Sequence, residues 1–542
     1  MSTFDKLYRT MLPLKFFSKG WGAPDTLLKL IENMKTVTNR DRFCLLKTKT
    51  NISIEKKSET MKTIEIEGSF LSPFDSVIPN VLTGNNKIAR FQMIIPKVWS
   101  TNYRPICVHF AGTGDHNYFR RRFLLANRLV DDGVASLIIM NPFYATRKPK
   151  EQRGSGLNFV SDLLIMGGAL IMECSALLEW CENSGYGPLA LHGISMGGYM
   201  SALCATVWPK PISLIPCLSW TSASVVFVEG ILSRTVDWSA LTKQYYSDSV
   251  YSGVIRRQLQ PCFPDLYKSD TTSNDYLGNY VKNPLKLSNT LYPKQSNPMN
   301  VDPLLTFSEQ TDTHLHVVSN IEVNSSNSSD SILQVCEELS PHTISMSDSA
   351  SQSSSHSDLQ ETRIIRRFLP YNVHISFPNS LSSINFNTIL RYPLDNPLWH
   401  NSVSFFRSLP DINRMMSTNS TPDPEVRQFL RDLLDHFTHL GNFSPVIDSR
   451  LVLSVAAEYD AYVPRHGVCS LSQIYPHGEI RFLPDSGHVG AYVRNAFWTD
   501  DFRRAINDCL NRQVQLYHHK PGPFGQNESR SMNAKSSRRS KG

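Results

Sequence analysis

The 542-residue chain lacks the features that define several classes of protein. None of its ten cysteines forms a CxxC pair, and most stand among apolar residues. We therefore expect buried free thiols instead of a disulfide framework or a zinc site. No apolar run reaches the roughly 18 residues that a membrane-spanning helix needs. The longest, at residues 163–172, lies between Asp162 and Glu173 and predicts a buried core helix.

An excess of one charge is also missing from the main body of the chain. The formal net charge is +7, but the residues after Gln515 hold six lysines and arginines against Glu528 alone. A nucleic-acid-binding protein usually spreads basic charge over its fold, so no nucleic-acid partner is expected. The chain has no Walker loop, no G-x-G-x-x-G after a strand, no H-E-x-x-H and no EF-hand loop, so we expect no metal and no other cofactor. Nothing in the pattern indicates an oligomeric state.

Short apolar runs alternate with stretches of helical pattern. Such alternation predicts an α/β fold with a mostly parallel central sheet and helices on both faces. The expected strands cover residues 88–96, 105–110, 135–140, 188–192, 212–217, 451–456 and 479–483. The expected helices cover about residues 118–132, 157–182, 425–440 and 467–475, with a last helix that ends near residue 510.

Composition divides the chain into five parts. Serine-rich runs between residues 319 and 358 contain few large apolar side chains, and such segments cannot bury enough surface to order themselves. We expect an N-terminal amphipathic and helical segment at 1–60, the first part of the core at 61–261, a long, largely disordered insertion at 262–424, the second part of the core at 425–514 and a disordered basic tail at 515–542.

The first 24 residues are basic and interrupted by apolar side chains. Lys6, Arg9, Lys15 and Lys19 stand against one acid, Asp5. Three interpretations are open: a mitochondrial transit segment, a helix that makes peripheral contact with a membrane, or an ordinary first helix packed on the domain. A secretory signal fits less well because Lys15 interrupts the apolar run. We expect a mitochondrial location, with a cytoplasmic or peripheral membrane location as the alternative.

The motif Gly193-Ile194-Ser195-Met196-Gly197 lies between a predicted buried strand and a predicted helix. A G-x-S-x-G at such a junction is typical of a sharp turn that exposes the serine oxygen at the edge of a sheet. Glycines at both flanks remove the Cβ atoms that would collide there. Ser195 is therefore the predicted nucleophile of an acyl transfer reaction.

A serine nucleophile needs a base and an acid that orients the base. With this motif the chain order is serine, acid, histidine. Asp460 follows the predicted strand at 451–456, and His488 follows the one at 479–483, so both lie at the edge where a parallel sheet presents catalytic groups. Glu458 and Asp485 compete as the acid. Glu458 lies nearer the strand and Asp485 is too close in sequence to His488, so we predict Asp460.

The tetrahedral intermediate also needs an oxyanion hole. One donor is expected to be the backbone N–H of Met196, and the other an N–H among Gly112, Thr113 and Gly114, in the loop after the strand at 105–110. A rival interpretation makes the next two residues, Asp115 and His116, a second acid–base pair. His109 and His192 are interpreted as hydrogen-bonded core residues.

Three arginines follow the same loop. Arg120, Arg121 and Arg122 are either a solvated basic face or a contact for an anionic head group of the substrate.

With these residues identified, the chain resembles the alpha/beta-hydrolase domain-containing protein 18 family. The resemblance covers about residues 7–262 and 427–510 and is lost in the serine-rich insertion and the tail. The motifs that carry it include Gly20-Trp21-Gly22, Ala111-Gly112-Thr113-Gly114-Asp115-His116, Met166-Gly167-Gly168-Ala169, the Ser195 motif, Trp208-Pro209-Lys210-Pro211 and Asp460-Ala461-Tyr462-Val463. It implies an alpha/beta-hydrolase fold, with Ser195, Asp460 and His488 as a triad, and suggests a lipid substrate and a mitochondrial location.

The combined expectation is a serine hydrolase of carboxylic esters that cleaves acyl esters of a lipid or phospholipid through an acyl-enzyme. An acyltransferase would use the same residues and differ only in the acceptor. A non-catalytic interaction protein on a hydrolase scaffold is the alternative of another class.

Overall fold

The computed structural model describes residues 2–11, 14–46, 50–259 and 422–518. Apart from its last three residues, the predicted insertion at 262–424 lies outside the described residues, as does the tail beyond residue 518. The strands are β1 Ser53–Glu59, β2 Thr63–Leu71, β3 Ile88–Pro96, β4 Ile106–Phe110, β5 Ala135–Ile139, β6 Leu189–Ile194, β7 Ser213–Cys217, β8 Leu453–Ala457 and β9 Glu479–Leu483.

The helices connect these strands and cover the sheet. The α-helices are α1 Thr3–Met11, α2 Pro24–Val37, α3 Arg40–Cys44, α4 Phe74–Val77, α5 Phe119–Arg121, α6 Asn127–Asp131, α7 Val160–Asn183, α8 Met196–Val207, α9 Trp238–Ser247, α10 Arg256–Gln258, α15 Pro424–Thr438, α16 Leu471–Ile474, α17 His488–Phe497 and α18 Asp501–Tyr517. Short 3-10 or π-helical turns are η1 Gly84–Lys87, η2 Arg122–Ala126, η3 Ala145–Arg147, η4 Val225–Glu229, η5 Ile231–Thr235, η6 Val250–Ile255, η8 Leu440–Asn442 and η9 Ser449–Leu451.

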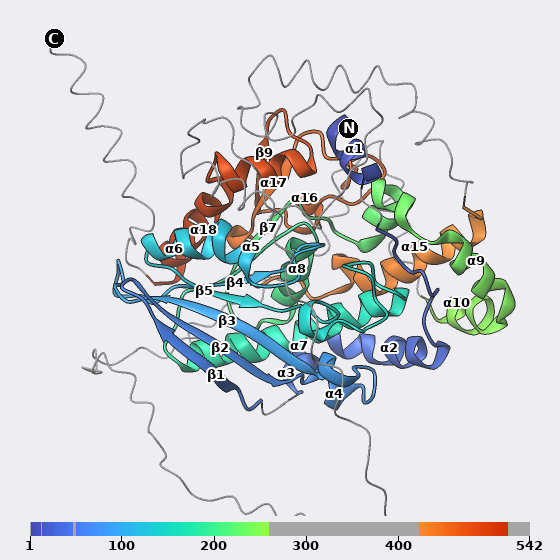
Figure 1. Cartoon of the computed structure of the whole chain (residues 1–542), viewed down its shortest axis with the longest axis horizontal. Helices are drawn as coiled ribbons and strands as arrows, with labels where there is room; N and C mark the ends of the chain where they lie inside the picture. The colour runs from blue at the N-terminus through green and yellow to red at the C-terminus, as the bar shows by residue number, and fades with distance from the viewer. Residues whose placement is uncertain (1, 12–13, 47–49, 260–421, 519–542) are drawn as a thin grey trace, which may run out of the picture. The chain divides into compact units, whose positions relative to one another are not determined.

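In the described part of the chain, nine strands form one sheet in the order β1-β2-β3-β5-β4-β6-β7-β8-β9. Strands β4 to β9 run parallel, whereas β1, β2 and β3 join the edge of β5 as an antiparallel ribbon. Figure 1 shows this ribbon in blue, leading away from the strands that carry the site. The predicted α/β fold with a mostly parallel sheet is confirmed.

Helices lie on both faces of the sheet because neighbouring residues of each strand point to opposite sides. In β4, Ile106 and Val108 join the hydrophobic cluster that contains α2, α7, α8 and α15, while Cys107 joins the cluster that contains α18. In β6, Leu189 likewise joins the first of these clusters and Ala190 joins the second. The eight cysteines of the described part are free thiols, and all except Cys44 are buried.

Two strands, β1 and β2, were not predicted from the sequence. Because β1 lies within residues 1–60, it corrects the prediction that this segment is helical. Every residue of β1, with the sequence SIEKKSE, is exposed, because this strand forms the edge of the sheet. An exposed edge strand shows no apolar pattern. Charged residues on edge strands also oppose pairing with another chain.

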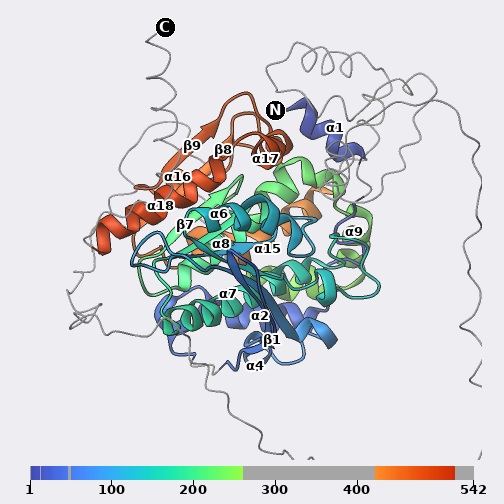
Figure 2. The same cartoon turned by 60° about the vertical axis from the view of Figure 1, so that its left-hand side comes forward.

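In the structure the N-terminal residues include a helix, α1, that packs on the domain, the arrangement that the third interpretation describes. Phe16 and Phe17 are buried, and their backbone N–H groups donate to Thr235 and Leu157, each at 2.7 Å. The indole Nε1 of Trp21 donates to the carbonyl of Leu241 at 3.0 Å. Helix α1 lies beside α17 in both views (Figure 1, Figure 2).

By length and composition α7 could cross a membrane, but 83% of its apolar window is buried inside the protein. It is the buried core helix that the sequence predicts. The other differences are local. Helix α16 covers four residues of the predicted 467–475, and the last predicted helix is divided into α17 and α18. His488 is the first residue of α17 instead of a loop residue.

Candidate active site

Ser195 lies at the junction of β6 and α8, as the motif predicts. Its backbone has φ 60° and ψ −123°, which L-amino acids rarely adopt. The N–H of Ser195 donates to the carbonyl of Cys217 on β7 at 2.8 Å. The side chain is partly exposed and stands at the positive end of the α8 dipole, where developing negative charge is favoured.

The flanking glycines leave no space for a side chain. A Cβ atom on Gly193 would overlap the backbone of Gly197, and one on Gly197 would overlap the carbonyl of Phe110 on β4. The strained turn is therefore held by close packing of three backbone segments.

One line of hydrogen bonds joins three of the predicted residues. Nε2 of His488 lies 2.9 Å from Oγ of Ser195. Nδ1 of His488 lies 2.8 Å from Oδ2 of Asp460. The other carboxylate oxygen, Oδ1, accepts the N–H groups of Tyr462 at 2.8 Å and Val463 at 3.0 Å. Asp460 is thus fixed by its own loop while it contacts the imidazole.

The imidazole of His488 is buried, and its surroundings tune its basicity. Burial by itself lowers the pKa of His488, but the Asp460 carboxylate, and to a smaller extent that of Asp5, raise this pKa above its ordinary value of 6.5. Tyr462 stacks on the imidazole with ring centroids 4.6 Å apart. A base with these neighbours is both oriented and strengthened.

The two competing acids lie elsewhere. The carboxylate of Glu458 accepts the backbone N–H of Asp485 at 3.1 Å. Asp485 is exposed and has φ 52°. Both residues belong to the surface turn beside the site, and Asp460 alone of the three is hydrogen-bonded to His488 in the described structure.

The loop predicted to supply an oxyanion donor lies against the nucleophile. A Cβ atom on Gly112 would lie 2.9 Å from the carbonyl of Ile194 and 4.0 Å from Cβ of Ser195. The hydroxyl of Thr113 lies 3.9 Å from Sδ of Met196, and Gly114 takes the left-handed φ of 87°. The loop at residues 112–114 therefore lies next to the Ser195 turn.

The structure corrects the picture of the three arginines as one anion contact. Arg121 is buried and its Nε lies 2.7 Å from the carboxylate of Asp115. Arg122 pairs with Glu65 on β2. Arg120 donates to the carbonyl of Gly114 at 3.1 Å. Two of the arginines thus pair with acidic residues of the fold, and the third contacts the loop that is predicted to supply an oxyanion donor.

The rival acid–base pair is not assembled. Asp115 is engaged by Arg121, and the ring of His116 lies against that of Tyr144 with centroids 4.7 Å apart. Burial lowers the pKa of His116 to about 4.

His109 and His192 form a buried pair with Nδ1 atoms 3.2 Å apart, and Nε2 of His109 lies 3.1 Å from Oγ of Ser136. This is the hydrogen-bonded core arrangement that the sequence predicts for them.

Sequence reasoning gave Asp5 no part in the site. Asp5 is fully buried, and its carboxylate contacts the backbone at His488, Val489 and Ala461. One weak signal in the sequence singles out this residue: Asp5 is the single acidic residue of the basic segment at residues 1–24.

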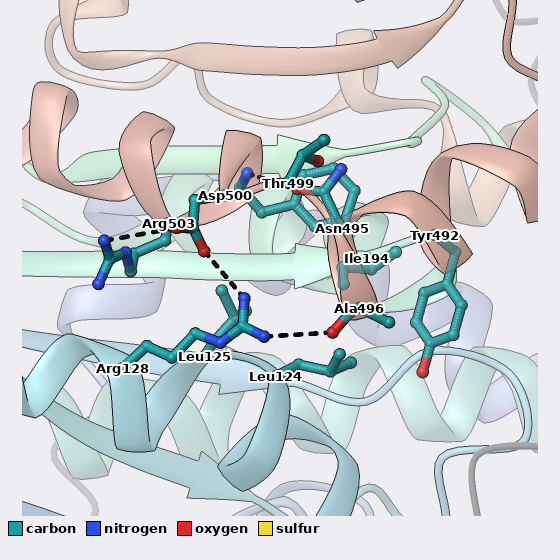
Figure 3. A pocket seen from close by; sticks show the side chains of 11 residues that line it. Leu124, Leu125, Arg128, Ile194, Tyr492, Asn495, Ala496, Thr499, Asp500 and Arg503 are labelled. Carbon is teal, nitrogen blue, oxygen red and sulfur yellow. Dashed lines mark hydrogen bonds and ion pairs between the residues drawn. The ribbon is translucent and has the colours of Figure 1, made fainter. Parts of the chain in front are cut away.

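A small hollow lies beside the residue that precedes the nucleophile. It is lined by Ile194, Leu124 and Tyr492 among others, and Figure 3 shows Arg128 beside it, bonded to Asp500 and to the carbonyl of Ala496. Its volume of about 10 Å³ has room for about one water molecule. An acyl chain does not fit there in this structure.

Some of the similar solved structures are esterases. Acetyl xylan esterase 1 from Thermoanaerobacterium sp. JW/SL YS485 is 10% identical over 92% of this chain and 99% of its own, with a TM-score of 0.33. The acetyl xylan esterase from Paenibacillus sp. R4 is 12% identical over 48% of this chain and 77% of its own, with a TM-score of 0.29. Similarity at this level gives no information about substrate.

The family model described as alpha/beta hydrolase domain containing 18 matches residues 14–512. This range includes the Ser195 turn, the Asp460 loop and the start of α17. The chain therefore belongs to the alpha/beta hydrolase domain containing 18 family.

Proposed function

We propose that this protein is a serine hydrolase of carboxylic esters, in which Ser195, His488 and Asp460 act as a catalytic triad. The observation that carries the proposal is the continuous line of contacts from Ser195 Oγ through His488 to Asp460, at 2.9 and 2.8 Å. It is built on a strained serine at a helix N-terminus, an arrangement that serves acyl transfer.

The proposed reaction has two halves. Oγ of Ser195 attacks the acyl carbonyl while Nε2 of His488 takes its proton, and the backbone N–H groups of Met196 and the Gly112 loop stabilise the oxyanion. His488 returns the proton to the leaving alcohol as the bond to the acyl carbon breaks. Water then attacks the acyl-enzyme by the same proton transfers, releasing the acid and Ser195.

The substrate we propose is an acyl ester of a lipid. Its support is the character of the side chains around the nucleophile: Ile194 and Met196 flank Ser195, and Tyr462 covers His488. The pairing of buried Arg121 with Asp115 and of half-buried Arg122 with Glu65 leaves no cluster of three arginines for a charged substrate. A mitochondrial location and contact with a membrane stay predictions.

A labelling experiment tests the function. Purified wild-type protein is expected to react with a fluorophosphonate probe at Ser195 and to hydrolyse p-nitrophenyl acyl esters. Ser195→Ala is expected to lose both, with a rate loss on the order of 10⁴-fold or more, while its melting temperature stays close to that of the wild type. Wild-type protein that is neither labelled nor active would favour a non-catalytic scaffold. Preferential transfer of the acyl group to an added alcohol would identify an acyltransferase.

A further inference from the structure

Helix α1 lies against the element that carries the proposed base. It packs beside the start of α17 (Figure 2). The backbone N–H of Ser2, just before α1, donates to the carbonyl of Tyr459 at 2.7 Å. The residues that the sequence leaves open as a removable or membrane-bound segment thus contact both loops of the site.

The carboxylate of Asp5 is the centre of this contact. Oδ2 accepts the N–H of His488 at 2.8 Å and that of Ala461 at 3.1 Å. Oδ1 accepts the N–H of Val489 at 2.9 Å. The side chain is completely buried, so it reaches these donors without competition from water.

These three donors belong to the two segments that must stay in register. His488 and Val489 begin α17, and their N–H groups would otherwise lack an intrahelical partner. Ala461 follows Asp460 directly. A single carboxylate therefore ties the backbone of the base to the backbone of the acid, in the manner of a helix cap supplied from a distant part of the chain.

The charge of Asp5 also acts on the imidazole. Burial raises the pKa of Asp5, although His488 and the N–H groups of Val489 and His488 lower it. The titratable groups around His488 are Asp460 and Tyr462 from the acid loop and Asp5 from α1, while Tyr8 and Arg9 of α1 interact with Tyr462. The carboxylate of Asp5 favours the protonated imidazole.

The fit between α1 and α17 is tight. A Cβ atom on Gly487 would overlap Ser2 and lie 2.6 Å from Oδ2 of Asp5. Arg9, which is also buried, donates through Nη2 to the carbonyl of Leu14 at 2.9 Å and fixes the end of the segment.

We propose that Asp5 is a positioning residue of the active site, which holds His488 and the Asp460 loop in register, and that helix α1 is an integral part of the hydrolase. This inference rests on the proposed function of the same site. It predicts that the active protein retains residue 5, so removal of the first 24 residues would remove a part of the site.

The test compares two variants with matched controls. Asp5→Asn removes the charge and places an amide donor against backbone N–H groups. Gly487→Ala displaces α1 without changing Asp5. Asp25→Asn, at an exposed acid in the first turn of α2, and Gly490→Ala, where a Cβ atom meets open space, are the controls. For each protein we would measure the melting temperature and the rate of fluorophosphonate labelling of Ser195 between pH 5 and 9.

Asp5→Asn and Gly487→Ala are expected to fold and to be labelled about 10²-fold more slowly at neutral pH, since small misplacements of catalytic groups have effects of this order. The acid limb of the profile, which is the decline of the labelling rate at acidic pH, is expected to move to lower pH. The reason is that loss of the nearby negative charge lowers the pKa of His488. Asp25→Asn and Gly490→Ala should match the wild type.

The remaining outcomes contradict either the role of Asp5 or the proposed function. Wild-type rate and an unchanged acid limb in Asp5→Asn would overturn the proposal, as would slower labelling with an unmoved acid limb, which marks a purely structural role. If Asp5→Asn does not fold, an unmoved acid limb in Gly487→Ala would overturn it. Wild-type protein that is not labelled at Ser195 would instead contradict the proposed function. Active protein isolated from its native cells without residue 5 would also refute the proposal.

Discussion

The ring of Tyr462 lies nearly parallel to the imidazole of His488, with 4.6 Å between centroids and 26° between planes. Tyr462 is two residues after Asp460, and its backbone N–H binds that carboxylate at 2.8 Å. One loop therefore holds the histidine in two ways, by a hydrogen bond at Nδ1 and by a ring across its face. The structure thereby fixes both the tilt and the rotation of the imidazole.

The stacking can be tested directly. Tyr462→Phe retains the ring and is expected to keep most of the esterase activity, whereas Tyr462→Leu is expected to lose up to about tenfold in kcat/KM, since aromatic pairs contribute roughly 0.5–1.5 kcal/mol beyond burial. Steady-state kinetics on p-nitrophenyl esters would measure both. Equal activity of the two variants would show that burial, and not ring stacking, is what His488 needs.

The choice of acid is tested by three matched amides. Asp460→Asn is expected to fold but to lose on the order of 10⁴-fold in kcat, because the amide favours the wrong imidazole tautomer and cannot stabilise the imidazolium. Glu458→Gln and Asp485→Asn should be mild, since both lie at the surface turn. Ester hydrolysis at neutral pH compares them. If Asp485→Asn had lost most of its hydrolytic activity and Asp460→Asn were nearly as active as the wild type, the acid would be Asp485.

The pH dependence follows from the raised pKa of His488. Because only the neutral imidazole can take the proton of Ser195, kcat/KM should be full above this pKa and decline as pH decreases through it. The midpoint is expected above 6.5, since Asp460 and Asp5 outweigh the effect of burial. A profile measured on an uncharged ester between pH 5 and 9 checks this. A midpoint below 6.5 would mean that burial dominates.

Stability should depend on a buried ion pair that is separate from the proposed triad. Nη1 and Nη2 of Arg147 lie 2.8 and 2.7 Å from the two carboxylate oxygens of Glu173, and both side chains are 0% exposed. Arg147→Met is expected to lose about 3–5 kcal/mol in the free energy of unfolding, because it leaves a buried carboxylate unpaired. Urea denaturation would measure this loss.

The double variant Arg147→Met, Glu173→Leu is the control for that prediction. It removes both charges and should recover a large part of the lost stability. If it is as unstable as Arg147→Met, the important contacts of Arg147 would be those with the carbonyls of Asn86 and Met140, which the double variant also lacks.

The amino-acid sequence by itself determined the strands that carry the site. The run at residues 188–192 is short and mostly apolar, the run at 479–483 alternates charged and apolar residues, and the structure has β6 and β9 there. The turn at Ser195 was readable because its signature lies in adjacent residues: two glycines around a serine between a strand and a helix. Asp460 and His488 could be placed because parallel strands present their ends at one edge.

Only the tertiary structure decided which polar side chains meet. The three arginines look alike in sequence, yet Arg121 and Arg122 are paired with Asp115 and Glu65. Asp5 is 483 residues from His488 in the chain, and the position of α1 brings its carboxylate to the first N–H groups of α17. Periodicity and local propensity report on neighbours in sequence, whereas these contacts depend on how separate elements pack, so no pattern around Asp5 or the arginines encodes them.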